Sequence, residues 1–108
     1  MERAVIVYTT WPTAVEAEAA GRRLVERRLA ACVNILPGMT SIYHWQGALE
    51  RGEEAVMIIK TRATLTDEVS AAVKELHTYE MPAVMVIALE HVEKSYLGWI
   101  LGETGLAQ

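Results

Sequence analysis

Hydrophobic residues recur along the chain with two alternating patterns, one typical of strands and one typical of helices. Alternating or continuous apolar runs rich in β-branched residues predict strands, whereas apolar residues three and four positions apart predict helices. The predicted order is strand, helix, strand, strand, helix, strand and a short closing helix. The strands cover residues 4–10, 31–46, 53–61 and 82–89, and the helices cover residues 13–29, 64–77 and 95–101.

The clearest local signals lie at the start of the first helix and in the last strand. Thr13 and Glu16 have the spacing of a capping box, in which the hydroxyl accepts from a first-turn amide and the glutamate reaches back. Residues 82–89 (PAVMVIAL) are almost continuously apolar, as expected of a strand that is buried on both faces.

This order of elements indicates one domain of the α+β class over residues 1–108. Each half of the chain is a strand, a helix and a strand, which is the ferredoxin-like split βαβ sandwich. Such a fold has four antiparallel strands, with both helices on one face of the sheet. A chain of 108 residues suits a single compact domain of this kind.

The second and third strands, with a turn placed at residues 47–52, are longer than the other strands can cover. We therefore expect an extended hairpin that carries Tyr43 and Trp45 beyond the sheet, with a bulge at Pro37 and Gly38. Exposed strand edges and aromatic side chains promote aggregation unless another chain covers them. A second copy of the same chain is the simplest partner, so the sequence predicts a homo-oligomer.

Composition and charge narrow the class of protein. Hydrophobic residues make up 52% of the chain and the formal net charge is −4, which disfavours nucleic acid as a partner. No apolar run approaches the roughly 20 residues that span a bilayer, and the N-terminus lacks the pattern of a secretory signal. The single cysteine excludes an intrachain disulfide and fits a reducing compartment. We therefore expect a cytoplasmic protein that binds neither nucleic acid nor a membrane.

Cys32 and His77 are the candidate metal ligands. Cys32 begins the second predicted strand and His77 ends the second predicted helix. Thiolate and imidazole bind soft metals such as Cu(I). The alternative roles are a small buried hydrophobe for Cys32 and a charge at a helix C-terminus for His77. The chain has no Cys-x-x-Cys and no histidine pair at helical spacing, so we do not expect a closed zinc site within one chain.

Lys60 is the best indication of a polar pocket, because a charge inside an apolar strand is costly unless it is paired or faces a cleft. Tyr43 and Trp45 share one face of their strand by its period of two, and we interpret them as interface or ligand-wall residues. A nucleophilic Cys32 would need a base within hydrogen-bond reach, and the sequence places none there. We therefore expect a binding protein and not an enzyme.

Three segments of the chain resemble the CutA divalent-cation-tolerance family. They are residues 30–47 (AACVNILPGMTSIYHWQG), 57–61 (MIIKT) and 77–82 (HTYEMP). The first segment is long and specific, and the similarity extends over residues 5–99. The resemblance implies a ferredoxin-like fold, a tight homotrimer assembled through the long hairpins and an architecture similar to PII signalling proteins. It also implies a cytoplasmic role in tolerance of copper and other divalent metals.

The same resemblance implies roles for individual residues. It places Cys32 and His77 at positions associated with metal binding, and it places Trp45, Lys60 and Tyr79 at the lining of clefts between subunits.

Two positions depart from the family pattern. Thr78 stands where the family usually has proline, and Thr9 stands where some members proposed to bind copper have cysteine. Cys32 and His77 are then a set of two ligands, which hold Cu(I) weakly or share an ion between subunits. The leading hypothesis is a trimeric protein that binds copper or another divalent metal. The alternatives are a PII-like sensor that binds a small anionic metabolite through Lys60, and a non-catalytic scaffold for another protein.

Overall fold

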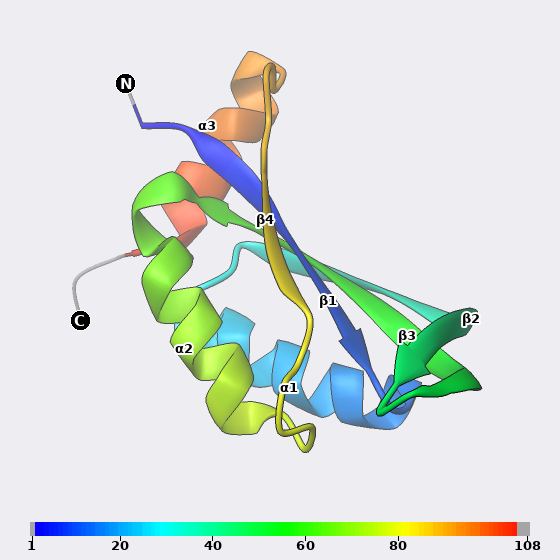
Figure 1. Cartoon of the computed structure of the whole chain (residues 1–108). Helices are drawn as coiled ribbons and strands as arrows, with labels where there is room; N and C mark the ends of the chain where they lie inside the picture. The colour runs from blue at the N-terminus through cyan, green and yellow to red at the C-terminus, as the bar shows by residue number, and fades with distance from the viewer. Residues whose placement is uncertain (1, 106–108) are drawn as a thin grey trace.

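The predicted order of strands and helices is confirmed in the computed structural model, which describes residues 2–105 (Figure 1). The elements are β1 (Ala4–Trp11), α1 (Ala14–Glu26), β2 (Cys32–Trp45), β3 (Ala48–Arg62), a 3-10 turn (Ala63–Leu65), α2 (Thr66–Leu76), β4 (Val84–Ala88) and α3 (Lys94–Glu103). None of the helices in this range is long and apolar enough to cross a membrane.

The four strands form one antiparallel sheet in the order β2-β3-β1-β4, which is the ferredoxin-like arrangement. Helices α1 and α2 cover one face of this sheet (Figure 1). The core lies between them, where alternate residues of the central strands, among them Val7, Met57 and Ile59, are completely buried. Leu24 of α1 and Val73 of α2 close the core from the helix side. We call the opposite side of the sheet the open face.

Helix α1 begins with the predicted Thr13 cap, because the Thr13 hydroxyl accepts from the backbone N–H of Glu16 at 3.1 Å. The Glu16 carboxylate reaches back to the Thr13 hydroxyl, at 3.4 Å. The predicted end at residue 29 was wrong, since the helix ends at Glu26. Arg28 has a φ of 61°, and this left-handed backbone cannot continue a right-handed helix.

The long hairpin extends beyond the sheet, as predicted. Strand β1 pairs with β3 only as far as Ala55, whereas β2 and β3 stay paired out to Trp45 and Ala48. The register shifts between Leu36 and Met39, which confirms the bulge at Pro37 and Gly38.

The hairpin turn is shorter than predicted. Gln46 and Gly47 both have positive φ, 51° and 84°, and this pair reverses the chain in two residues as a tight hairpin turn does. The predicted turn at residues 47–52 was wrong because residues 48–52 continue the ladder with β2.

The prediction that the last strand is buried on both faces was also wrong for the single chain. β4 is an edge strand that pairs only with β1. Met85, Val86 and Ile87 are 53%, 47% and 49% exposed. The continuous apolar run therefore forms surface instead of core, because no further element of residues 2–105 covers this edge.

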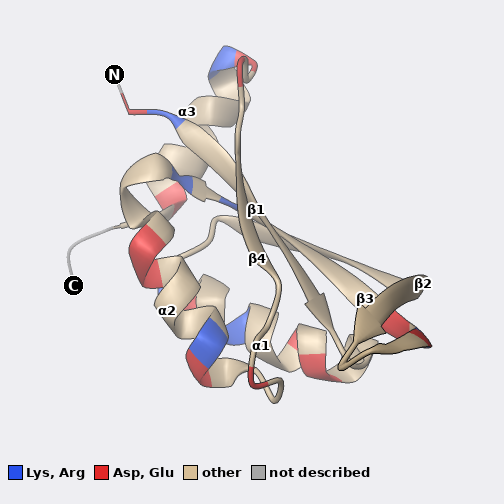
Figure 2. Cartoon of the chain, viewed as in Figure 1, with Lys and Arg blue, Asp and Glu red and all other residues tan. Residues whose placement is uncertain are grey.

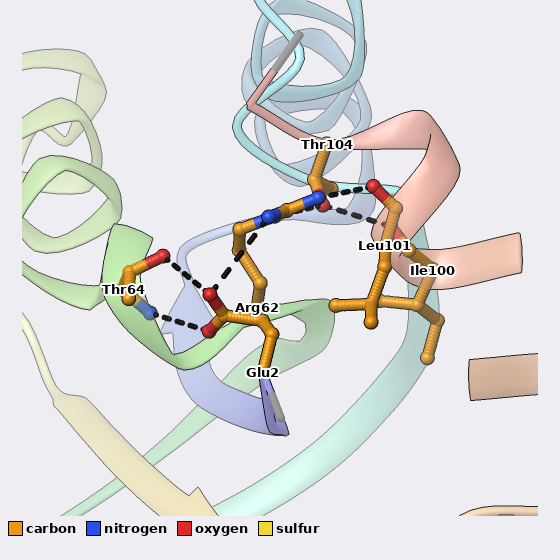
Figure 3. Close-up of polar contacts among 6 residues, drawn as sticks. All are labelled: Glu2, Arg62, Thr64, Ile100, Leu101 and Thr104. Atoms are coloured by element: carbon orange, nitrogen blue, oxygen red, sulfur yellow. Dashed lines mark hydrogen bonds and ion pairs between the residues drawn. The ribbon is translucent and has the colours of Figure 1, made fainter. Parts of the chain in front are cut away.

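Arg62 fastens α3 to the end of the sheet (Figure 3). Its Nε donates to the hydroxyl of Thr104 at 3.0 Å, and a terminal nitrogen donates to the carbonyl of Leu101. The other terminal nitrogen lies 3.8 Å from the Glu2 carboxylate, which accepts from the backbone and hydroxyl of Thr64. One guanidinium thus joins the start of β1, the end of β3 and the end of α3.

Candidate functional site: an aromatic and acidic groove beside the hairpin

A groove of about 360 Å³ opens where the hairpin leaves the sheet. Three segments form it: the end of β1, the outer part of the hairpin and the loop between α2 and β4. Its lining residues are Thr10, Tyr43, Trp45, Glu54, Tyr79, Glu80, Met81 and Ala83.

Glu54 is the polar centre of the groove. Its Oε2 accepts from the phenol of Tyr79 at 2.9 Å, and its Oε1 accepts from the hydroxyl of Ser41 at 2.7 Å. The register of the hairpin sets this arrangement, because Met39 pairs with Glu54. Ser41, like Tyr43 and Trp45, therefore points to the same side of the hairpin as the carboxylate.

Tyr79 keeps its proton over a wide range of pH. Partial burial, followed by the hydrogen bond to Glu54 and the charge of that carboxylate, raises the pKa of Tyr79 from 10.0 to about 12. The nearby charge of Glu16 acts in the same direction. At neutral pH Tyr79 is therefore a hydrogen-bond donor that points at Glu54.

His77 positions the loop that carries Tyr79. Its ring stacks on buried Trp11, with centroids 4.1 Å apart and an interplanar angle of 22°. Nε2 lies 2.7 Å from the carbonyl oxygen of Thr10, and Nδ1 accepts from the backbone N–H of Tyr79 at 3.1 Å. A carbonyl only accepts and an amide only donates, so this geometry requires the neutral ring with its proton on Nε2. Both ring nitrogens are thus engaged with backbone, and a metal would have to displace one of these bonds.

Cys32 lies at the other end of the sheet. It faces Lys60 across the β2–β3 ladder, and Lys60 faces Ile6 of β1. His77 contacts β1 at Thr10, four residues further along, which is about 13 Å of strand. One chain therefore does not bring the two predicted metal ligands together. Within residues 2–105, no group of three or more His, Cys, Asp or Glu side chains is arranged to hold a metal ion.

The three predicted cleft residues separate in the same way. Trp45 and Tyr79 line the groove, whereas Lys60 lies outside it. The Lys60 ammonium donates to the Tyr96 phenol at 3.2 Å and lies 5.4 Å from the centroid of that ring. Lys60 is thus paired within the chain, on the part of the open face next to α3.

Glu54 and Glu80 are lining residues that the sequence reasoning did not select. The sequence does contain an indication for Glu54, because a carboxylate immediately before the apolar run of residues 55–59 suggests a polar site at the end of a buried strand. It contains none for Glu80, since the position of Glu80 depends on the path of the loop after α2.

Comparison with known proteins agrees with this fold over nearly the whole chain. Residues 5–103 match the family model described as CutA1 divalent ion tolerance protein. The divalent-cation tolerance protein CutA of Thermus thermophilus is 38% identical over 105 residues, which are 97% of this chain and 100% of that protein. The CutA homolog of Xenopus laevis is 41% identical over 86% of this chain, which spans 62% of that protein. The crystal structure of CutA1 from Ehrlichia chaffeensis superposes with a TM-score of 0.94 at 29% identity, covering 98% of this chain and 99% of that one.

Proposed function

The chain belongs to the CutA1 divalent ion tolerance family, and we propose that it acts as a cytoplasmic homotrimer that binds a divalent metal such as copper. We further propose that it does so as a binding protein and catalyses no reaction. The observation that carries the assembly is the uncovered apolar surface of the sheet.

The open face and both sheet edges favour association between copies. Leu36 on β2 and Met85 and Ile87 on β4 are exposed on or beside this face. The strands at the two edges, β2 and β4, have unpaired backbone groups on their outer sides. Exposed apolar edges of this kind are an aggregation hazard, and a closed ring of copies covers all of them at once.

The proposed metal ligands are Cys32 and His77 from different subunits. The thiol lies partly exposed on the open face, so an interface built on this face would bring it close to a neighbouring chain. His77 would contribute only after releasing the Thr10 carbonyl or the Tyr79 amide. A site with two ligands, one of them engaged elsewhere, holds Cu(I) weakly.

The decisive experiment is an anaerobic titration of the reduced trimer with Cu(I) against a competing chelator. We expect the affinity to fall by at least about tenfold in both Cys32→Ser and His77→Ala, because each removes one of only two ligands. His44→Ala, which changes an exposed histidine on the hairpin, should bind like the wild type. Equal affinity in all four proteins would overturn the metal assignment.

His77→Ala also removes the ring that stacks on Trp11. A loss of copper binding in this variant must therefore be distinguished from a loss of local structure. The near-ultraviolet circular dichroism of the variant shows whether the surroundings of Trp11 are retained. Copper X-ray absorption of the wild type reports the ligand set directly. A spectrum without sulfur ligation would overturn the role of Cys32 whatever the variants do.

A second candidate function is a PII-like sensor of a small anionic molecule, and the ammonium of Lys60 on the open face, outside the groove, favours it. An anionic ligand that binds through Lys60 should raise the melting temperature of the trimer by mass action, and Lys60→Met should abolish the rise. A panel of anionic metabolites at millimolar concentration that leaves the melting temperature unchanged would contradict this function.

A further inference from the structure

The charged side chains that line the groove are all acidic. Glu54 and Glu80 are its charged residues, and no lysine or arginine of residues 2–105 lines it. Neither glutamate takes part in an ion pair within residues 2–105, because the ion pairs there involve other glutamates. Figure 2 shows acidic segments on the hairpin, at the start of α1 and in the loop before β4.

The Glu54 carboxylate is half-buried and its charge is not balanced within the described chain. Its hydrogen-bond donors, Tyr79 and Ser41, are neutral hydroxyls. A carboxylate has about four acceptor positions, so each oxygen retains capacity for another donor or for a positive charge. Partly burying a carboxylate without a cation is unfavourable, and this cost decreases when a positively charged group enters the groove.

Aromatic rings form the walls around this charge. Tyr43, Trp45 and Tyr79 are 46%, 47% and 37% exposed in the single chain. In the proposed trimer, a ligand contacts these rings where the neighbouring copy leaves the groove open. Tyr79 is held in place by the bond to Glu54 and by its contact with His77, at 4.6 Å between ring centroids. The face of an aromatic ring attracts a cation, and cages of such rings select alkylated ammonium groups.

We propose that this groove binds a small organic cation of the quaternary ammonium type. The aromatic side chains of Trp45, Tyr43 and Tyr79 contact its methyl groups, and Glu54 balances its charge. The volume of about 360 Å³ lies within the range of small-molecule sites. A bare metal ion would gain little from the aromatic walls, and no three His, Cys, Asp or Glu side chains of residues 2–105 are arranged to hold one. This binding goes beyond metal tolerance and uses neither Cys32 nor the ring nitrogens of His77.

The test compares choline with its neutral isostere 3,3-dimethylbutan-1-ol, which has the same shape without the charge. Isothermal titration of the wild-type protein should give saturable choline binding, at least about tenfold tighter than the binding of the alcohol. No saturable choline binding, as expected if a side chain of a neighbouring copy already fills the groove, would overturn the assignment. Equal affinity for the two compounds would overturn it as well.

Matched variants locate the site. Glu54→Gln and Trp45→Ala should each weaken choline binding by about tenfold. Glu53→Gln changes the adjacent carboxylate, which faces the other side of β3 and lies 3.9 Å from Arg51. Trp99→Phe changes an exposed aromatic residue on α3. Both controls should bind choline like the wild type, and a loss in the controls equal to that in the groove variants would place the ligand elsewhere. Copper binding through Cys32 is measured separately, so failure of either assignment leaves the other intact.

Discussion

His77 links three parts of the chain through its own ring and its neighbour. The ring nitrogens bond the backbone of Thr10 in β1 and of Tyr79 in the loop. The adjacent Thr78 donates to the carboxylate of Glu16 at 3.4 Å. The loop is therefore fastened to β1 and to the start of α1 by side chains, and this holds the Tyr79 phenol against the hairpin.

The hydrogen-bonded phenol of Tyr79 makes the stability of the fold depend on pH in the alkaline range. Its pKa in the folded protein is raised from 10.0 to about 12, so the folded state holds the phenolic proton more tightly than the unfolded state does. The resulting stability is fully present below the unfolded pKa and is lost as the pH rises through the folded pKa. We expect the free energy of unfolding of the wild type to fall relative to Tyr79→Phe between pH 10 and about 12.

Urea unfolding of both proteins across this pH range measures the difference. Ultraviolet titration of the phenolate gives the pKa directly, as the step that Tyr79→Phe lacks. Glu54→Gln should move that step toward the ordinary value, because the charged acceptor is gone while the burial remains. Parallel pH profiles for the wild type and Tyr79→Phe would contradict the Glu54–Tyr79 hydrogen bond.

Part of the candidate site could be predicted from the sequence of individual residues. The period of two placed Tyr43 and Trp45 on one face, and the structure puts both in the groove. The sequence could not place Lys60 relative to Tyr79, because their separation depends on how β3 aligns with β1 and on the path of the loop after α2. For the same reason it could not show that Cys32 lies far along the sheet from His77.

Among the elements, the long central strands and the first two helices could be predicted. The errors lie at the hairpin turn and at β4, where the sequence pattern alone does not determine the structure. The hairpin turn is Gln46–Gly47, and Gln-Gly lacks the first residue of the common Asn-Gly turn signal. A continuous apolar run predicts burial, but sequence does not say whether the covering surface belongs to the same chain. For β4, no element of residues 2–105 covers the edge.

Gly21 is required where α1 approaches the sheet. A Cβ at this position would lie 2.7 Å from Val33 Cγ2 and 3.1 Å from Met57 Sδ. Alanine favours a helix over glycine by up to about 1 kcal/mol, whereas overpacking a core costs about 1–3 kcal/mol, and Val33 is stiff about its first side-chain torsion. We expect Gly21→Ala to lower the free energy of unfolding in urea.

Gly98 provides the matched control, because a Cβ built there in α3 meets nothing within 4 Å. Gly98→Ala should therefore stabilise the protein by roughly 0.5–1 kcal/mol. If both substitutions stabilised the protein equally, α1 would not pack as closely on β2 as this structure has it.

Arg62 is expected to control the docking of α3. Arg62→Ala removes the donors to Thr104 and Leu101 and leaves the Glu2 carboxylate without its ion pair. Hydrogen exchange should then become faster across α3 (Lys94–Glu103), by an amount equivalent to about 1–3 kcal/mol. Arg22→Ala breaks an exposed pair with Glu18 and should change exchange little. Ile100 of α3 also packs with Ala4 and Ala31 in a small buried apolar cluster, and unchanged exchange in α3 after Arg62→Ala would show that this cluster alone holds the helix.

Over the whole molecule, the two sides of the sheet differ in how far their apolar residues are covered. Helices α1 and α2 complete the core on one side. The open side has exposed apolar residues, two free edges and a hairpin that continues past the end of β1. The same fold therefore satisfies its own core and leaves a surface that favours contact with further copies.

Two lysine substitutions test whether this surface mediates the proposed trimer. Ile87 on β4 faces the open side and is 49% exposed, whereas Val15 at the start of α1 is 78% exposed on the helix side. Each substitution puts a charge on the surface of one chain, but only Ile87→Lys would bury that charge in the proposed interface, where it is unfavourable without a partner. We expect light scattering to give a trimer for the wild type and Val15→Lys, and a smaller species for Ile87→Lys that reassembles as protein concentration rises. Far-ultraviolet circular dichroism separates dissociation from unfolding. A wild type that is monomeric, or an Ile87→Lys trimer as stable to dilution as the wild type, would show that this face does not mediate assembly.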